Sequence, residues 1–440
     1  MEDDTPGQPP DATDEQPHGL RRRSLIGAAG AGALAVGAGA GYLARGRAEA
    51  AEPTAADPDA VPVAFTGEHQ AGITTPAQDR LHFAAFDVIT DDRDELVSLL
   101  QDWTDAARAM TSGNEVGKFG AVAGPLVVPP EDTGEALGLS ASGLTLTIGF
   151  GPTLFETADG KDRFGLRDRR PERLADLPGF AGDMLESEIS GGDIAVQACA
   201  NDPQVAVHAI RNLARIAFGR ASVRYSQLGF GRTSSTSQAQ VTLRNLFGFK
   251  DGTANIKQED RDTVERWVWA RPGDGPAWMD GGSYLVTRKI MMRIETWDRE
   301  SLDGQQGIIG RAKGTGGPMS GGDEFEPLDL AATGRDGNPK IDTLAHVRLA
   351  HPSNNGGVKL LRRGYNFVDG SDQLGRLAAG LFFICYQRDP GEQFVRIQQS
   401  LAGLTQDLMN EYIVHVGSGI FACPPGLGGD GYWGETLFEA

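Results

Sequence analysis

The chain has 440 residues, of which 40% are hydrophobic and 23% are charged, as in a soluble globular protein long enough for two domains. Its formal net charge of −19 argues against nucleic-acid binding, which requires a basic face, so no nucleic-acid partner is expected. Three cysteines (Cys199, Cys385 and Cys423) are too few for a disulfide framework and lack the spacing of a structural zinc site.

Residues 1–50 have the three-part layout of an export signal. Basic residues at 21–23 precede an uncharged Ala/Gly-rich run from Ser24 to Ala44, and Ala-Glu-Ala at 48–50 offers a cleavage site. The paired arginines followed by Ser-Leu-Ile resemble a twin-arginine signal, which exports proteins already folded. We therefore expect an extracytoplasmic protein that acquires a cofactor before export. An uncleaved membrane anchor is the alternative.

The next residues, 51–62, are rich in Ala, Pro and Asp and are expected to form a disordered linker. Strands and helices then alternate through the first half of the chain. Its expected strands are 81–90, 144–150, one of about seven residues in the segment that begins at Gly191, and 222–231. Its expected helices are 92–110 and a second one that begins at Pro203 after the capping Asp202.

The second half repeats one unit of the first. The segments that begin at Gly191 and Ala379 each contain an apolar strand, an Asp-Pro break and an amphipathic helix, and a further strand is expected at 282–297. This repetition predicts an α+β fold of two ferredoxin-like domains with antiparallel sheets. A polar stretch at 232–243 separates them, which gives domains at 63–235 and 236–440.

Asp251 follows an apolar run and precedes a glycine, in "NLFGFKDGTANI". Asp-Gly is first of all a turn signal, and this turn is expected beside the domain junction, where pockets often form. The Gly-rich segment 310–324 lacks the spacing of a nucleotide-binding loop.

The segment after it contains two histidines, His346 and His351, and then Arg362. His415 is expected near the end of a helix, as a structural residue. An imidazole, a carboxylate and an arginine on separate segments suit a hydrolytic triad, a non-haem iron site or a haem pocket. No nucleophile elbow is present, and the iron site would need a second well-placed imidazole. For the haem pocket, every residue type that the site requires is present.

Four segments resemble motifs of the dye-decolourising peroxidases, in the family's order: "GFKDGTANI" the GxxDG motif, "AHVRLAHP" the proximal-histidine segment, "LLRRGYNF" the distal-arginine segment, and "NEYIVHVGSGIFACPPG" the C-terminal signature. With the export signal, the chain is similar to the exported subgroup that accompanies bacterial iron uptake. The resemblance covers most of residues 65–440 and implies two ferredoxin-like domains with one haem b in the C-terminal half.

The resemblance also implies roles for individual residues. His346 would be the axial iron ligand, and Asp251 and Arg362 the catalytic pair on the opposite side. An acid from the last helix would hydrogen-bond the ligand, with Asp407 preferred to Glu411. The other expected haem-lining residues are Gly252, Thr253, Ala254, His351, Pro352 and Ser353. Relatives often have Asn-Pro-Arg where this chain has His-Pro-Ser, which leaves the partner of a haem propionate open.

The expected activity is reduction of hydrogen peroxide through a ferryl intermediate, with oxidation of dyes, phenolics or other small reductants. A carboxylate is a weak base at neutral pH, so dye oxidation should be fastest at about pH 3–5. Bulky substrates would pass electrons to surface aromatics, for which the candidates are Tyr365, Tyr386, Trp267, Trp269 and Trp433.

Two other functions stay open: a deferrochelatase-like protein that releases iron from haem, and a ferredoxin-like binding module without haem. The sequence also leaves open whether iron-uptake components are partners and whether the chain forms a homo-oligomer.

Overall fold

The structure is a computed structural model that describes residues 61–403 and 406–439. The predicted signal and most of the predicted linker lie outside the described residues. The described residues belong to one compact unit by their internal contacts. Within the described ranges, no helix is long and apolar enough to cross a membrane.

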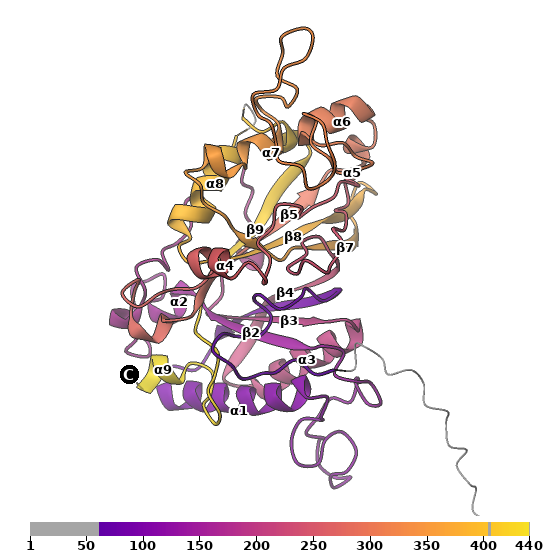
Figure 1. The fold of residues 1–440 in the computed structure, drawn as a ribbon. Helices are drawn as coiled ribbons and strands as arrows, with labels where there is room; N and C mark the ends of the chain where they lie inside the picture. Colours follow the sequence, from indigo (N-terminus) through magenta and orange to yellow (C-terminus); the bar gives the residue numbers. More distant parts are fainter. Residues whose placement is uncertain (1–60, 404–405, 440) are drawn as a thin grey trace, which may run out of the picture. The chain divides into compact units, whose positions relative to one another are not determined.

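The first half folds as a ferredoxin-like unit. Its strands lie in the order β4-β1-β3-β2, with every neighbour antiparallel (Figure 1). The elements are β1 (Arg80–Val88), α1 (Arg93–Thr111), β2 (Thr145–Phe150), α2 (Pro152–Phe155), β3 (Ile194–Ala200), α3 (Pro203–Ile216) and β4 (Ala221–Arg232). The two long helices begin where the sequence predicts, because the side chains of Asp92 and Asp202 accept hydrogen bonds from free N–H groups of the first turn.

The second half has the same strand arrangement, in which β7-β8-β5-β9 corresponds to β2-β3-β1-β4 of the first half. Its strands are β5 (Ser283–Met292), β6 (Leu361–Arg362), β7 (Tyr365–Ser371), β8 (Leu377–Gln387) and β9 (Ile413–Cys423). Its helices are α4 (Arg261–Trp267), α5 (Ile294–Trp297), α6 (Leu302–Ile309), α7 (His346–Leu349), α8 (Arg396–Leu401) and, at the C-terminus, α9 (Glu435–Glu439). The predicted α+β class with two ferredoxin-like units is therefore confirmed.

The two sheets join at their edges. Phe150 in β2 pairs with Ala422 in β9, and Phe230 in β4 pairs with Asn366 in β7. Because β5 also pairs with β8, the described strands close into a ring. No pattern in the sequence predicted this closure, since it depends on short pairings between segments more than 130 residues apart.

Alternation along the strands sends side chains to two different cores. In β1, Leu81 and Phe83 pack between the two sheets against residues such as Phe382 of β8, whereas Phe86 packs under the outer helices against Trp103 of α1. Figure 1 shows α1 and α3 along the outer face of the first sheet, and α6, α7 and α8 beyond the strands of the second. The space between these later helices and their sheet contains the site described below.

Three expectations about elements need correction. His415 lies in β9, not near the end of a helix, and it pairs with Ile290 of β5. The strand expected at 282–297 ends at Met292 and is followed by α5. Strand β7 was not expected at all, because its second half is exposed and carries no alternating apolar pattern.

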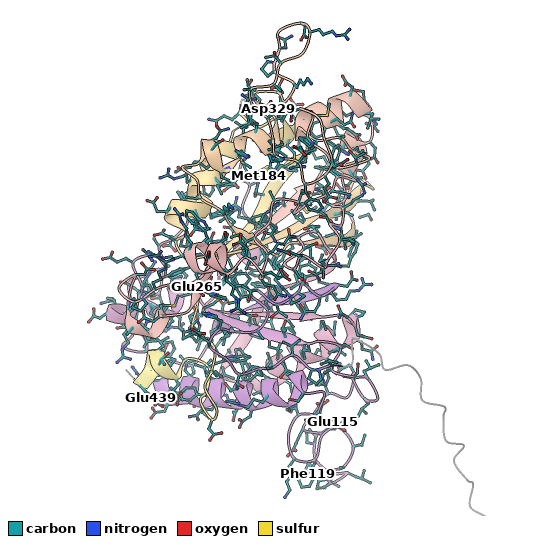
Figure 2. All side chains as sticks on the ribbon, in the orientation of Figure 1. Glu115, Phe119, Met184, Glu265, Asp329 and Glu439 are labelled. Atoms are coloured by element: carbon teal, nitrogen blue, oxygen red, sulfur yellow. The ribbon has the colours of Figure 1, made fainter. Side chains whose placement is uncertain are left out.

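Two long loops extend from the strands and helices. One connects α1 to β2 and carries Glu115 and Phe119, and the other connects α6 to α7 and carries Asp329 (Figure 2). The second loop includes the Gly-rich segment 310–324, which folds back against the turn that contains Asp251.

Candidate active site

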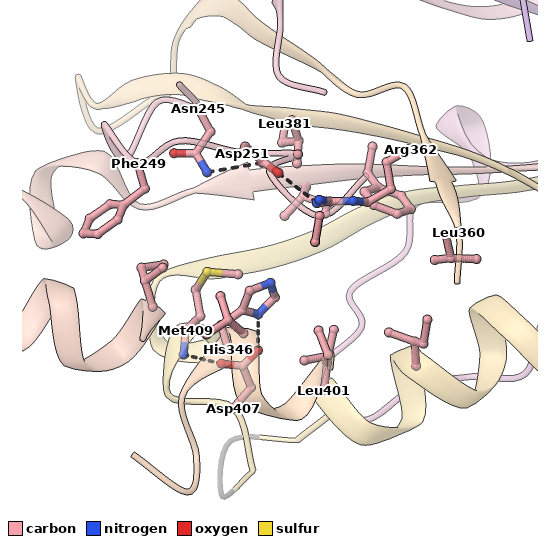
Figure 3. Close-up of a pocket in the computed structure, with 18 of the residues that line it drawn as sticks. Asn245, Phe249, Asp251, His346, Leu360, Arg362, Leu381, Leu401, Asp407 and Met409 are labelled. Carbon is pink, nitrogen blue, oxygen red and sulfur yellow. Dashed lines mark hydrogen bonds and ion pairs between the residues drawn. The ribbon is translucent and has the colours of Figure 1, made fainter. Parts of the chain in front are cut away.

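A cavity of about 270 Å³ lies against the outer face of the second sheet. Its walls are largely apolar. The apolar side chains labelled in Figure 3 are Phe249, Leu360, Leu381, Leu401 and Met409. The polar and charged groups that also border this space act beside an apolar surface, where electrostatic interactions are stronger than in bulk water.

Asp251 and Arg362 form an ion pair on one side of the cavity (Figure 3). Nη1 of Arg362, in β6, donates to Oδ1 of Asp251 at 2.8 Å, and the two side chains are 29% and 14% exposed. Oδ2 of Asp251 has only a long contact of 3.4 Å, from Nδ2 of Asn245. One carboxylate oxygen is therefore fixed by the guanidinium, while the other is freer to exchange a proton.

The buried side chain of Asn255 connects the two halves of this pair. Its Nδ2 donates to the carbonyl of Arg362 at 2.8 Å, and its Oδ1 accepts from the backbone N–H of Arg362 at the same distance. Asn255 also closes the turn after Asp251, because its N–H donates to the carbonyl of Gly252. Sequence reasoning missed this residue, although it lies in the segment that was singled out.

Glu324, from the Gly-rich loop, holds the same turn from the other side. Its carboxylate accepts hydrogen bonds from Lys250 and from Oγ1 of Thr253, the latter at 3.2 Å. Burial raises the pKa of Glu324, but these hydrogen bonds and one from Thr242 outweigh burial and place it below its usual value. Glu324 is therefore an anion that fixes the residues on both sides of Asp251.

His346 and Asp407 form a second pair on the opposite side of the cavity. Nδ1 of His346, the first residue of α7, lies 2.7 Å from Oδ2 of the buried Asp407. The other ring nitrogen has no partner among the described residues and points toward the Asp251–Arg362 pair in Figure 3. Burial lowers the pKa of His346, but the charge and hydrogen bond of Asp407 raise it above the usual value.

The predicted acid does not come from a last helix. Asp407 caps a short 3-10 helix, Leu408–Glu411, just before β9, and accepts from the N–H of Met409. The backbone carbonyl of Glu411, the second choice, accepts from Arg293.

The other predicted lining residues mostly border the cavity. These are Gly252, Thr253, Ala254, His351 and Pro352. Ser353 is not among the described residues that line it, and its hydroxyl lies 2.7 Å from Nδ1 of His351.

The predicted surface aromatics need correction, since four of the five are buried. Tyr365 and Tyr386 lie inside the ring of strands, and Trp269 and Trp433 are at most 3% exposed. Only Trp267 is partly exposed.

The comparisons with known proteins identify the family. Residues 70–231 match the family described as Dyp-type peroxidase, N-terminal, and residues 242–427 match Dyp-type peroxidase, C-terminal. The chain is 36% identical to the dye-decolorizing peroxidase of Thermobifida fusca (strain YX), over 97% of this chain and 99% of that protein. It is 35% identical to the deferrochelatase of Escherichia coli (strain K12), over 95% and 97% respectively.

Ferric DtpA from Streptomyces lividans has the same fold, with a TM-score of 0.78 and 37% identity, over 88% of this chain and all of that one. A two-unit fold of this kind, with the imidazole of His346 facing an acid and an arginine across an apolar cavity, is that of a haem peroxidase. The chain belongs to the Dyp-type peroxidase family.

The residues of the cavity fit haem, the cofactor of this family. His346 presents one unbonded ring nitrogen in an apolar space, which is what axial ligation of a flat porphyrin requires. Among the described residues, no group of three or more His, Cys, Asp or Glu could hold a bare metal ion, so the alternative of a non-haem iron site has no ligand set.

Proposed function

We propose that His346 binds the haem iron and that Asp251 and Arg362 act on hydrogen peroxide from the opposite side. The observation that carries this assignment is the direction of the unbonded ring nitrogen of His346 toward the Asp251–Arg362 pair across one cavity (Figure 3). The haem, when bound, supplies the iron at which peroxide is reduced. Small phenolic or dye-like reductants supply the two electrons.

Asp251 moves a proton between the two oxygens of peroxide. Cleavage of the O–O bond, which releases the first water molecule, requires that one oxygen lose its proton and that the other gain it, so a single group that accepts and returns a proton serves this step. The two electrons of the reductant and two further protons then convert the second oxygen to water. Oδ2 is suited to this role, because Oδ1 is occupied by Arg362.

Arg362 has two functions in this arrangement. It orients the carboxylate of Asp251 through Oδ1, and its fixed positive charge stabilises negative charge on the departing oxygen. The apolar walls exclude water and so strengthen both interactions.

The test is stopped-flow mixing of the haem-loaded protein with hydrogen peroxide, followed through the Soret band. We expect Asp251→Asn and Arg362→Leu each to slow the reaction about 10²–10³-fold. His346→Ala should lose the spectrum of a histidine-ligated haem. Asp369→Asn and Arg376→Leu are matched controls, because both side chains form ion pairs elsewhere. Wild-type rates in both cavity variants would refute the assigned roles.

A second candidate function is release of iron from haem, since relatives named deferrochelatase align over 95% of the chain. We infer that such a protein would act after export, with the signal at residues 1–50 and iron-uptake components as partners. Incubation with haem under reducing conditions, followed by analysis of the porphyrin, tests this function. Metal-free protoporphyrin supports it, and haem recovered unchanged contradicts it.

A further inference from the structure

Three arginines line the cavity, and they differ in their partners. Arg288 pairs with Asp183, and Arg362 pairs with Asp251. Arg311 lies within ion-pair distance of no carboxylate among the described residues. A buried cation without a counter-ion is costly, so its retention here requires an explanation.

Arg311 is held by backbone carbonyls and directs its remaining N–H groups elsewhere. The residue is 8% exposed, and its Nη1 donates to the carbonyls of Gly316 at 2.7 Å and Glu324 at 2.9 Å. Its Nε and Nη2 have no hydrogen-bond partner within the described part of the chain. Neither atom is completely enclosed by protein, so both remain accessible. Because Arg311 borders the cavity, these N–H groups are available to a ligand bound there.

The charges around Arg311 leave a positive excess. The nearest acid, Glu324, already binds Lys250 and Thr253 through its carboxylate. Burial and the neighbouring Arg362 lower the pKa of Arg311, although Glu324 opposes this effect. Three cations (Lys250, Arg311 and Arg362) therefore share two carboxylates in a chain that is acidic as a whole.

Arg311 borders the same cavity as Arg362, His346 and His351. It acts electrostatically on Arg362, and it also contributes, after burial, to the lowered pKa of His351, which follows α7. Its positive charge is therefore available to an anionic group of a ligand bound in this cavity.

We propose that Arg311 binds a carboxylate group of a ligand in this cavity. Two sources share this chemistry: a propionate of the haem, and a carboxylate on a reducing substrate. Either would neutralise the uncompensated guanidinium with charge-assisted hydrogen bonds from Nε and Nη2. If the carboxylate is a haem propionate, Arg311 would be the propionate partner that the sequence leaves open, because Ser353 stands where relatives often have an arginine.

The experiment measures cofactor affinity, which is independent of peroxide chemistry and of the roles proposed for Asp251 and Arg362. Apo-protein is titrated with haem and with its dimethyl ester, in which both propionates are blocked. We expect Arg311→Met to weaken haem binding about 10–100-fold but to leave binding of the ester unchanged. Arg311→Lys should recover part of the loss. Arg244→Met is the matched control, because Arg244 holds the carbonyls of Lys313 and Gly314 in the same loop and does not line the cavity.

The carboxylate belongs to the substrate if Arg311→Met keeps the wild-type haem affinity but has a higher KM for a carboxylated phenol, with an unchanged KM for a neutral phenol. The proposal is overturned if neither haem affinity nor this KM changes. It is also overturned if Arg311→Met weakens haem and its ester equally, or if Arg244→Met has the same effect, because a structural role would then suffice.

Discussion

Asp251 is a carboxylate in apolar surroundings, and its hydrogen bonds explain how the chain tolerates it there. Arg362 offsets its charge at 2.8 Å, and the backbone N–H of Asp251 is bound by the carbonyl of Leu243. A carboxylate without a partner in such surroundings is costly, because its charge loses the stabilisation that water provides. The ion pair with Arg362 offsets this cost at the position where the proposed function needs a base.

Asp407 should control the electron density of the iron through His346. Asp407→Asn keeps the shape but removes the charge 2.7 Å from Nδ1. We expect a higher reduction potential of the haem iron and about 10–100-fold lower peroxidase activity, as for other partners of metal-binding histidines. Spectroelectrochemistry measures the potential. Glu411→Gln is the control, and an unchanged potential in Asp407→Asn would contradict this role.

Asn255 should set the geometry of the catalytic pair without touching peroxide. Asn255→Ala leaves the partly buried N–H and carbonyl of Arg362 without these partners, which costs up to about 1–3 kcal/mol for each and lets the residue shift. We expect slower reaction with peroxide and weaker binding of fluoride to the ferric haem, with haem content unchanged. Fluoride titration followed by absorbance measures this directly. Unchanged fluoride affinity would show that Arg362 keeps its position unaided.

At the residue scale, the sequence indicated the residues of the proposed catalytic site more readily than the residues that hold them in place. Asp251, His346 and Arg362 lie in recognisable motifs, and the structure gathers them at one cavity. Asn255 holds the backbone carbonyl of Arg362, which is 107 positions away in the sequence. Arg311 is itself held by backbone carbonyls. A backbone partner leaves no mark on the sequence, so such contacts become visible only when the fold is known.

Among the elements, the turn after Asp251 has the strictest requirement. Gly252 has φ of +85°, and a Cβ atom there would lie 2.8 Å from the Cα of Ser234. Because backbone cannot move aside as a flexible side chain can, Gly252→Ala should displace the turn. We expect at least a tenfold slower reaction with peroxide, since a misplacement of about 1 Å can cost a hundredfold.

The matched control for this substitution is Gly314→Ala, in the neighbouring Gly-rich loop. Gly314 has ordinary φ, and no atom lies within 4 Å of the position of its Cβ. Stopped-flow rates of the two variants should therefore differ, with Gly314→Ala close to the wild type. Equal rates would mean that the turn tolerates a side chain and is not the rigid support described above.

The repeated strand-Asp-Pro-helix unit was predicted correctly because each part has a local cause. Asp202 caps α3, and the N–H of Glu392 donates to Asp389 in the corresponding place. The second helix nevertheless begins as a π-helix, Gly391–Val395, before α8. His415 was misplaced because the residues before it resemble a helix end, whereas strand pairing with β5 decides its conformation.

At the scale of the whole molecule, the ring of strands buries polar groups that acid should disturb. His82 lies in β1 at the centre of the first sheet, and burial lowers its pKa to about 4. Its Nδ1 has no hydrogen-bond partner. The folded chain therefore keeps this ring neutral at pH values where the unfolded chain would protonate it.

The sign of the effect follows from these two pKa values. Between about pH 6.5 and pH 4 the unfolded state binds a proton that the folded state does not, so stability falls as the pH falls. For His82 the loss reaches about 3 kcal/mol at pH 4. Thermal unfolding between pH 7 and pH 4.5 should show this slope in the wild type and a flatter one in His82→Gln. Parallel curves would contradict the assignment.

This acid sensitivity opposes the pH dependence expected of the active site, where protonation chemistry based on a carboxylate favours about pH 3–5. Initial rates, measured within seconds, should therefore peak at lower pH than total turnover over an hour, because unfolding removes enzyme during the longer assay. In His82→Gln the two optima should move closer together, with the initial-rate optimum unchanged. If the optima coincide in the wild type, acid unfolding does not limit the enzyme and the active site alone sets its working pH.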